Sequence, residues 1–295
     1  MLTRIRPVYE FEYGDAGAYA QVGLQFLDAY YGNGDGKAHV ANPVPVNSYI
    51  WGGGGAWYST VNNDGAASVT DMYGSGLSMS SIQTTITDTN LVRAFGLHVA
   101  GYEGGFYVGN NSGSTSTSQQ ALQLSANYSS AAAGMEAQSI NLFYHDGGEL
   151  PFVFNSVGGT YGVAGPTLHE QATPKLAGIA AATAALPAAP LIGRAAPATL
   201  PISTAALASG TTAAGGTLAA PGQYIGWTIS LAAGGKFTVA TDSATPAAQV
   251  IYIDGVPAGA GPWTGPLAKG LHGIRVQDIG AGGMTLRNLA VTAAP

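Results

Sequence analysis

The sequence predicts an α/β fold followed by an all-β part, and three observations predict it. Apolar strand-like runs alternate with segments of helical spacing through residues 1–187. An Ala/Pro/Gly-rich stretch with almost no charge occupies residues 188–221 and is typical of a linker. Beyond residue 222, short strand-like runs alternate with turn residues, as in a β-sandwich. We therefore expect two domains, at 1–187 and 222–295, which suits a chain of 295 residues.

The first part is predicted to contain about four strand–helix units, which implies a parallel sheet with helical crossovers. Its strands are expected at residues 4–10, 46–51, 97–102 and 139–144. Its helices are expected at 18–31, at 78–95, from about 118 to 133, and from Thr173-Pro174-Lys175 onward, where proline fits the first helical turn. Four such units are half of a (β/α)8 barrel, so we expect a partial barrel.

The second part is predicted to be a β-sandwich, because its apolar runs are short and evenly spaced. Strands are expected at residues 224–231, 236–241, 249–253, 270–276 and 284–291, and a further one is possible near 199–207. Asp254-Gly255 lies between two of these runs and predicts a hairpin turn.

Composition excludes several classes of function. Only 9% of the residues are charged, the formal net charge is −6, and there are 10 Lys and Arg together, so nucleic acid is not an expected partner. The absence of cysteine excludes disulfides and thiolate metal sites, and no metal or cofactor is expected. No apolar stretch is long enough for a membrane span.

The surface composition points to export. Glycine, alanine, serine, threonine and asparagine replace the missing charge, which suits neutral hydroxylated ligands and is common in secreted or cell-surface proteins. Residues 1–7 lack the apolar core of a signal peptide, since Arg4, Arg6 and Pro7 interrupt them. We therefore expect that export is signalled elsewhere or that the chain belongs to a longer parent protein.

Glu103 is the first candidate for chemistry. It lies in Gly101-Tyr102-Glu103-Gly104-Gly105, where an apolar strand gives way to a glycine pair. In a parallel barrel, a carboxylate at the C-terminal end of a strand lies on the catalytic face, so an open position there is expected. The alternative is a glutamate that caps the next helix or pairs with an arginine at the rim.

Glu10 and Glu12 are the next candidates, in Tyr9-Glu10-Phe11-Glu12-Tyr13 at the end of the first expected strand. Strand alternation places both on one face and the aromatic residues on the other. Either could donate a proton, or both could bind hydroxyl groups or be plain rim residues.

Several motifs, taken in order, resemble a known family. They are Arg6-Pro7-Val8, Phe26-Leu27-Asp28-Ala29-Tyr30-Tyr31-Gly32-Asn33, Ser48-Tyr49-Ile50-Trp51-Gly52, the Glu103 motif, and Asn141-Leu142-Phe143-Tyr144. Over roughly residues 4–186 the chain resembles glycoside hydrolases of the large retaining barrel clan that contains cellulases, mannanases and xylosidases. The later hairpin and the strand at 270–276 resemble accessory modules of such enzymes.

The resemblance implies roles for particular positions. Glu103 would be the nucleophile at the end of strand seven, with residues 4–10 as strand five and 139–144 as strand eight. The acid/base of the clan belongs at the end of strand four, a segment that this sequence does not contain. Retaining hydrolysis needs two carboxyl groups, so Glu10 or Glu12 would have to supply the second.

Other residues are candidates for substrate binding. Trp51, Trp57 and Tyr58 surround the glycine run and could stack on sugars or pack under the loop, and Tyr102 would lie beside the nucleophile. His145 and Asp146 follow the fourth expected strand at the catalytic rim, although a turn role is the alternative for Asp146. His98 is expected to be a core histidine. Trp263 could stack on a sugar or cover one end of the sandwich.

Two functions follow as hypotheses: a glycoside hydrolase or the C-terminal part of one, or a non-catalytic carbohydrate-binding or surface-assembly protein. A half-barrel would leave open sheet edges and an apolar face. We therefore expect carbohydrate as a ligand, and a partner chain that completes the barrel, either a distinct N-terminal half or a second copy.

Overall fold

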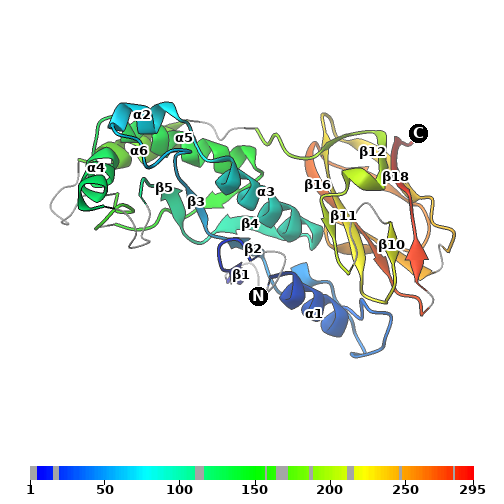
Figure 1. Ribbon diagram of the computed structural model, residues 1–295. Coiled ribbons are helices and arrows are strands. Elements are labelled where there is room, and N and C mark those ends of the chain that lie inside the picture. The colour runs from blue at the N-terminus through cyan, green and yellow to red at the C-terminus, as the bar shows by residue number, and fades with distance from the viewer. Residues whose placement is uncertain are drawn as a thin grey trace.

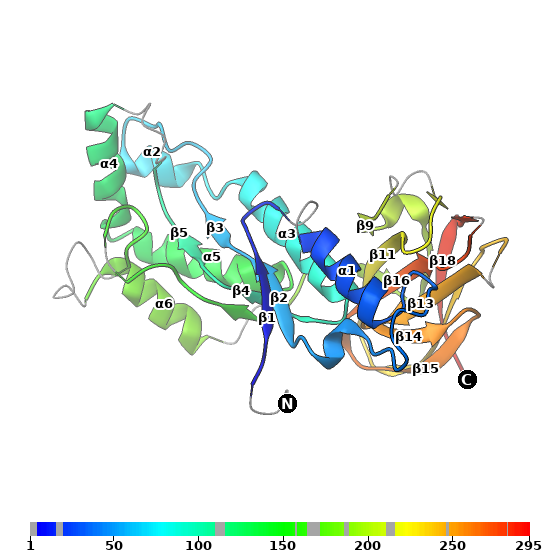
Figure 2. The same cartoon turned by 90° about the horizontal axis from the view of Figure 1, so that it is seen from below.

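The computed structural model describes residues 5–15, 20–109, 116–156, 158–163, 172–185, 189–210, 216–245, 248–281 and 283–295. The fold is mixed α/β with several sheets, and a large β-rich part follows the helical part along the chain (Figure 1). Helices α1 (Gln21–Tyr31) and α3 (Met79–Ala94) reach across to the β-rich part, so the two parts lie in contact (Figure 2).

The first sheet has four strands, all parallel, in the order β1-β2-β4-β6. These are β1 (Val8–Phe11), β2 (Gly52–Gly55), β4 (His98–Gly101) and β6 (Leu150–Pro151). Their order in space follows their order in the chain, so β1 and β6 form the two edges. Helices α1, α3, α5 (Ala132–His145) and α6 (Pro174–Ala184) alternate with the strands and share one apolar core with them.

Strands β2 and β4 continue beyond short breaks. Each leads into a second short strand, β3 (Trp57–Ser59) and β5 (Gly104–Phe106), and these two pair in parallel. The remaining helical elements are η2 (Val46–Ser48), α2 (Val69–Gly74) and α4 (Thr117–Asn127). Residues of α2, α4 and β5 form a separate small apolar cluster at the end of the molecule away from the β-rich part (Figure 1).

The strand expected at 46–51 was wrong. Residues Val46–Ser48 form a 3-10 turn, and the strand is the glycine run that follows, β2. This run is buried along its whole length between β1 and β4. A methyl group on Gly54 would overlap the main-chain oxygen of Ala100, so the close approach of β2 and β4 requires glycine there.

The strand expected at 139–144 was also wrong, because these residues belong to helix α5. Within 139–144 the buried residues are Ser139, Ile140 and Phe143, a spacing of one helical face rather than of a strand. The fourth strand of the sheet lies later, at β6. The short apolar run could not be assigned from its own composition, since a buried strand and a buried helix look alike over such lengths.

Three helix predictions were confirmed. The helix expected at 18–31 is α1 (Gln21–Tyr31), the one expected at 78–95 is α3, and the one expected at Thr173-Pro174 is α6. The Thr173 hydroxyl accepts a hydrogen bond from the Leu176 N–H at 3.3 Å, and Pro174 occupies the first turn. The helix expected to run to residue 133 ends earlier, since α4 stops at Asn127 and α5 begins at Ala132.

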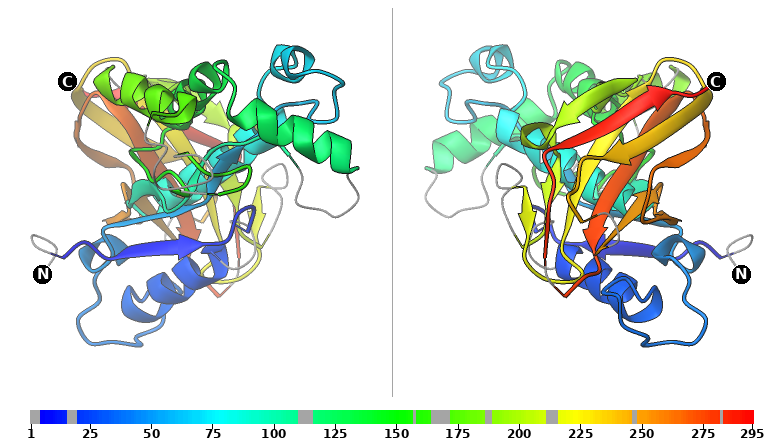
Figure 3. Two further views of the ribbon diagram at one scale, coloured as in Figure 1. Left: turned by 90° about the vertical axis from the view of Figure 1, so that its left-hand side faces the viewer. Right: turned by 90° about the vertical axis from the view of Figure 1, so that its right-hand side faces the viewer.

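The β-rich part contains two sheets around one apolar core (Figure 3). One has the order β14-β13-β16-β11-β7, with β9 also paired to β11, and the other has the order β15-β12-β18-β8. A small pair, β10 and β17, completes the described strands of this part. The strands are β7 (Arg194–Ala196), β8 (Ala198–Pro201), β9 (Leu207–Ala208), β10 (Thr217–Leu218), β11 (Tyr224–Leu231), β12 (Gly235–Thr241), β13 (Gln249–Ile253), β14 (Val256–Gly259), β15 (Trp263–Leu267), β16 (Gly270–Asp278), β17 (Met284–Thr285) and β18 (Asn288–Ala293).

The expected hairpin at Asp254-Gly255 joins β13 to β14, and both residues have positive φ angles, 49° and 74°. The segment expected as a linker differs from that expectation. Residues 188–221 contribute β7, β8, β9, β10 and the 3-10 turn η3 (Ile202–Thr204), so much of this segment pairs with the later strands. Its low charge and small side chains fit sheet edges as well as a linker.

A buried ion pair joins the two parts. Arg275 on β16 donates to both carboxylate oxygens of Asp28 on α1, at 3.0 and 3.1 Å, and the two side chains are 1% and 3% exposed. The Gln277 amide also donates to Asp28, at 2.8 Å. Three aromatic rings surround the guanidinium, those of Phe95, Tyr224 and Tyr252 at 4.5, 5.5 and 3.8 Å. Both hydrogen bonds and ring contacts therefore compensate the burial of this charge.

Among the helices that the structure describes, none combines the length and the apolar character needed to cross a membrane.

Candidate functional site

Glu103 lies in the break between β4 and β5, at the edge to which the parallel strands lead. Its side chain is half-buried. The main-chain oxygen of Glu103 accepts a hydrogen bond from the Trp57 N–H at 2.9 Å, which ties this break to the equivalent break between β2 and β3. The position is therefore set by main-chain pairing on both sides.

Two tyrosine hydroxyls donate hydrogen bonds to the Glu103 carboxylate, those of Tyr58 and Tyr102. Burial raises the pKa of both phenols, and the negative charge and hydrogen bond of Glu103 raise it further. Tyr58 comes from β3, and Tyr102 directly precedes the glutamate. With raised pKa values, both hydroxyls remain donors at neutral pH.

Glu10 faces Glu103 across β2. Glu10 is in register with Gly54, and β2 pairs on its other side with β4, whose end leads to Glu103. Because β2 consists of glycine, no side chain of that strand separates the two carboxylates. Partial burial and the negative charge of Glu103 raise the pKa of Glu10. Both effects disfavour the charged form of Glu10 relative to an isolated glutamate.

Glu12 belongs to the same acidic group, since its charge and that of Glu10 both contribute to the raised pKa of Tyr102. It is exposed and lies beyond the end of β1. The structure thus gathers the three carboxylates that the sequence singled out, Glu10, Glu12 and Glu103, around Tyr102. Within the described residues, no group of three or more potential ligands is arranged to hold a metal ion.

Aromatic side chains surround Tyr58 beside this acidic group. The ring of Tyr58 makes edge contacts with Tyr13, Tyr107, Phe154 and Tyr161 at 6.4, 5.9, 6.2 and 5.3 Å between centroids. Tyr13 and Phe154 are each 39% exposed. Sequence reasoning did not single out these four rings. Tyr107 could have been found from its place just after β5, but Phe154 and Tyr161 come from loops with no local signal.

Trp57 and Trp51 both pack against other side chains. Trp57 is 3% exposed, donates from Nε1 to the main-chain oxygen of Phe152 at 3.1 Å, and packs on Phe143. Trp51 directly precedes β2, stacks on the His98 ring at 4.5 Å between centroids, and has the Arg6 guanidinium 5.0 Å from its ring. Their packing role, the alternative considered from the sequence, is what the contacts support.

His145 and Asp146 lie at a different place from the one expected. They end helix α5 and precede β6, so they are on the side from which the strands start, away from Glu103. The error follows from the strand expected at 139–144. Asp146 is 5% exposed, and its Oδ2 atom has no hydrogen-bond partner.

Trp263 belongs to the β-rich part. It begins β15, is partly buried, and packs against the apolar core of the two sheets. This contact fits the covering role considered for it from the sequence.

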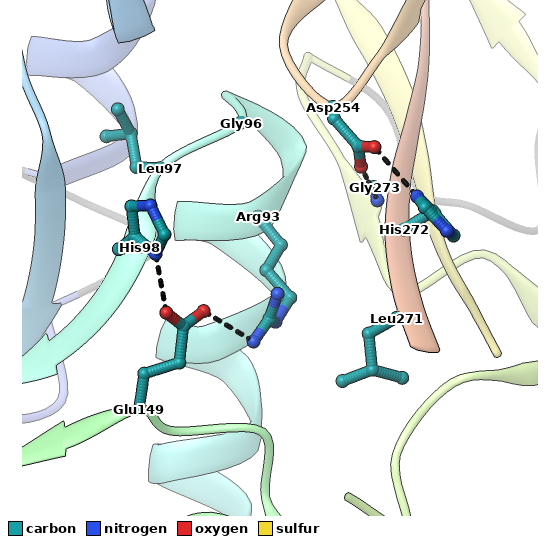
Figure 4. A pocket seen from close by; sticks show the side chains of 9 residues that line it. All are labelled: Arg93, Gly96, Leu97, His98, Glu149, Asp254, Leu271, His272 and Gly273. Atoms are coloured by element: carbon teal, nitrogen blue, oxygen red, sulfur yellow. Dashed lines mark hydrogen bonds and ion pairs between the residues drawn. The ribbon is translucent and has the colours of Figure 1, made fainter. Parts of the chain in front are cut away.

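A second polar site lies between the two parts, in a cavity of about 160 Å³ (Figure 4). On one wall, Glu149 accepts from Arg93 at 2.9 Å and pairs with His98 at 2.5 Å. On the other wall, His272 pairs with Asp254 at 2.7 Å. The His98 side chain is 51% exposed, so the expectation of a core histidine was wrong. Each of the two carboxylates at this site, Glu149 and Asp254, therefore has a basic side chain within hydrogen-bonding distance.

The carboxyl groups of Asp88, Glu136 and Asp146 are buried in the helical part. Asp88 and Asp146 are 4% and 5% exposed, each has one oxygen without a hydrogen-bond partner, and burial raises the pKa of each to about 7. Burial also raises the pKa of Glu136, which accepts from the Phe106 N–H at 3.2 Å, while nearby Lys175 donates to the Phe106 oxygen at 2.7 Å. This pair holds both main-chain groups of Phe106 in β5.

From these raised pKa values we expect the free energy of unfolding to fall as the pH rises from about 4 to about 7. In this window the folded state binds more protons than the unfolded state. Each such group contributes a slope of up to about 1.4 kcal/mol per pH unit. The raised pKa of His272 adds a further fall in stability only above about pH 6.5, where the unfolded imidazole loses its proton first. The measurement is the denaturant midpoint across this range. Asp88→Asn should flatten the slope and Asp71→Asn, an exposed site on α2, should not. Stability that rises with pH would contradict the prediction.

Comparisons with known proteins identify no family. No family model matches the chain, and no curated protein matches it. One similar solved structure is a cycloisomaltooligosaccharide glucanotransferase of Paenibacillus sp. in complex with cycloisomaltoheptaose, at 19% identity and a TM-score of 0.25. The match covers 34% of this chain and 18% of that chain. So loose a likeness carries no argument, and the function must be inferred from the residues around Glu103.

Proposed function

We propose that this chain is a glycoside hydrolase, or the C-terminal part of one, that cleaves β-linked glycans by a retaining double displacement. The observation that carries the proposal is that Glu103 lies near enough to Glu10, on the other side of the glycine strand β2, for its negative charge to raise the pKa of Glu10. In this reading, the parallel sheet corresponds to strands five to eight of a (β/α)8 barrel, and the β-rich part is an accessory module. Secretion or display on the cell surface belongs to the same proposal.

The environments of the two carboxyl groups support different roles for them. Glu103, held by the Tyr58 and Tyr102 hydroxyls, attacks the anomeric carbon as a carboxylate and forms a glycosyl ester. Glu10, whose pKa is raised, donates its proton to the leaving glycosidic oxygen. Water then attacks the ester, Glu10 takes the proton from that water, and Glu103 is released as a carboxylate.

The aromatic rings support carbohydrate as the ligand. Tyr13 and Phe154 are partly exposed beside the acidic group, and sugar rings present flat C–H faces that pack on aromatic rings. Glu12 is placed to accept hydrogen bonds from sugar hydroxyls in the same region.

The test is a screen of the purified chain against aryl β-glycosides and soluble polysaccharides, with product stereochemistry recorded for any substrate that is cleaved. Retention of configuration is expected, because one carboxylate attacks and the other protonates. Inversion, or the absence of both turnover and binding across the panel, would contradict the proposal.

A second candidate is non-catalytic carbohydrate binding or surface assembly. The exposure of Glu10 and Glu12 favours it, since exposed carboxylates serve as readily to bind hydroxyls as to transfer protons. Binding of an oligosaccharide without any turnover, lost on replacing Tyr13 and Phe154 by alanine, would support this candidate over the hydrolase.

A further inference from the structure

The free edge of β1 is the feature that carries a new inference. Within the described residues, β1 pairs with β2 only, so its other side has no neighbouring strand. Viewed from below, β1 and helix α1 are the described elements nearest the viewer (Figure 2). An open edge of this kind pairs readily with another strand.

The main chain of β1 presents a regular set of donors and acceptors to this edge. The Pro7 oxygen accepts from the N–H groups of Trp51 and Gly52 at 2.8 and 3.3 Å, so residue 7 faces β2. Since peptide groups alternate along a strand, Val8 and Glu10 of β1 turn their N–H and C=O groups to the free side, and Arg6 continues the same alternation if the pairing extends one residue pair beyond β1. Proline lacks an N–H, but at position 7 that loss falls on the β2 side.

The charges along this edge are complementary to themselves. Arg6 and Glu10 lie two residues before and two residues after Val8. In an antiparallel pair of identical strands centred on Val8, each Arg6 lies directly opposite the Glu10 of the other copy. The same pairing sets Ile5, which is 63% exposed, opposite Phe11. The hydrogen-bonding residues and the oppositely charged residues therefore coincide in a single register.

Helix α1 adds apolar surface on the same side of the molecule. Val22, Phe26 and Tyr30 recur every four residues and are 63%, 59% and 42% exposed. Helix α1 packs on the face of β1 that carries the Tyr9 side chain, because the Tyr9 hydroxyl lies against Gly23. Two copies joined edge to edge would place both α1 helices on one face of the extended sheet.

We propose that the chain forms a two-fold symmetric dimer in which the β1 strands of two copies pair antiparallel about Val8, with Arg6 of each copy opposite Glu10 of the other. The interface is isologous, so both charge pairs form at once. The occupant of the edge is a second copy of this chain, and Arg6 of that copy lies beside the Glu10–Glu103 group.

The test is sedimentation equilibrium across the micromolar range. The wild-type chain is expected to be a dimer that weakens with added salt. Arg6→Glu and Glu10→Arg should each weaken the dimer by about tenfold or more, because each places like charges opposite one another at two positions. The double variant Arg6→Glu/Glu10→Arg restores opposite charges and should recover the wild-type dissociation constant to within about threefold.

Lys269→Glu, an exposed charge change in the β-rich part, is the matched control and should leave the dimer intact. Circular dichroism confirms that each variant is folded. A wild-type chain that stays monomeric at all concentrations would overturn the proposal and leave the edge to a strand from another chain. A double variant no better than the single variants would overturn the register.

Discussion

Replacing Glu103 by glutamine is expected to reduce turnover of a glycan substrate by several orders of magnitude while leaving the fold intact. Glutamine has the same shape and can still accept hydrogen bonds from Tyr58 and Tyr102, but it cannot form the glycosyl ester. The loss should appear in kcat, since the interaction removed belongs to the reaction step. The measurement is steady-state kinetics on the best substrate from the screen.

Two further variants separate the roles in this site. Glu10→Gln should slow cleavage of substrates with poor leaving groups more than of those with good ones, because only the former need protonation. Asp71→Asn, exposed on α2, should leave kinetics unchanged. If Glu103→Gln kept full activity with an unaltered thermal midpoint, Glu103 would not be the nucleophile.

Replacing Asp28 by asparagine is expected to destabilise the protein by about 3–5 kcal/mol, because Arg275 would be left buried without its counter-charge. The aromatic rings around the guanidinium attract it but cannot accept its in-plane hydrogen bonds. The measurement is the free energy of unfolding in denaturant, followed by tryptophan fluorescence.

The double variant Asp28→Leu/Arg275→Met removes both charges and should recover much of the lost stability. Lys37→Ala removes an exposed lysine that pairs with Asp35 at 3.7 Å and should change stability by less than about 1 kcal/mol. If Lys37→Ala and Asp28→Asn lowered the free energy of unfolding equally, the buried pair would contribute no more to stability than a pair at the surface.

Local sequence patterns determined much of the secondary structure. The strands at Tyr224–Leu231 and Gln249–Ile253 match their expected bounds, because short apolar runs between turn residues specify buried strands. The Asp254-Gly255 turn and the Thr173-Pro174 helix start were predictable for the same reason: each depends on the conformational preference of one or two residues.

The candidate site was predictable in part. Glu103, Glu10 and Glu12 each lie where a strand ends, and parallel strands bring their ends to one edge, so their proximity followed from the strand pattern. Tyr58 and Tyr102 were found by their closeness to glycine-rich strand ends. Tyr161 and Phe154 were not, because the loops that bring them to Tyr58 have no periodicity of their own.

The sequence by itself thus determined the class of fold, most elements and the acidic group at the strand ends, since each depends on neighbours within a few residues. Tertiary structure alone decided that the glycine run is a strand, that residues 139–144 are helical, and that Asp28 meets Arg275 from 247 positions away. Glycine has little intrinsic preference for strands, so a glycine run forms a strand only where close approach to a neighbouring main chain requires it. The location of a buried charge likewise depends on the partner that the fold brings beside it.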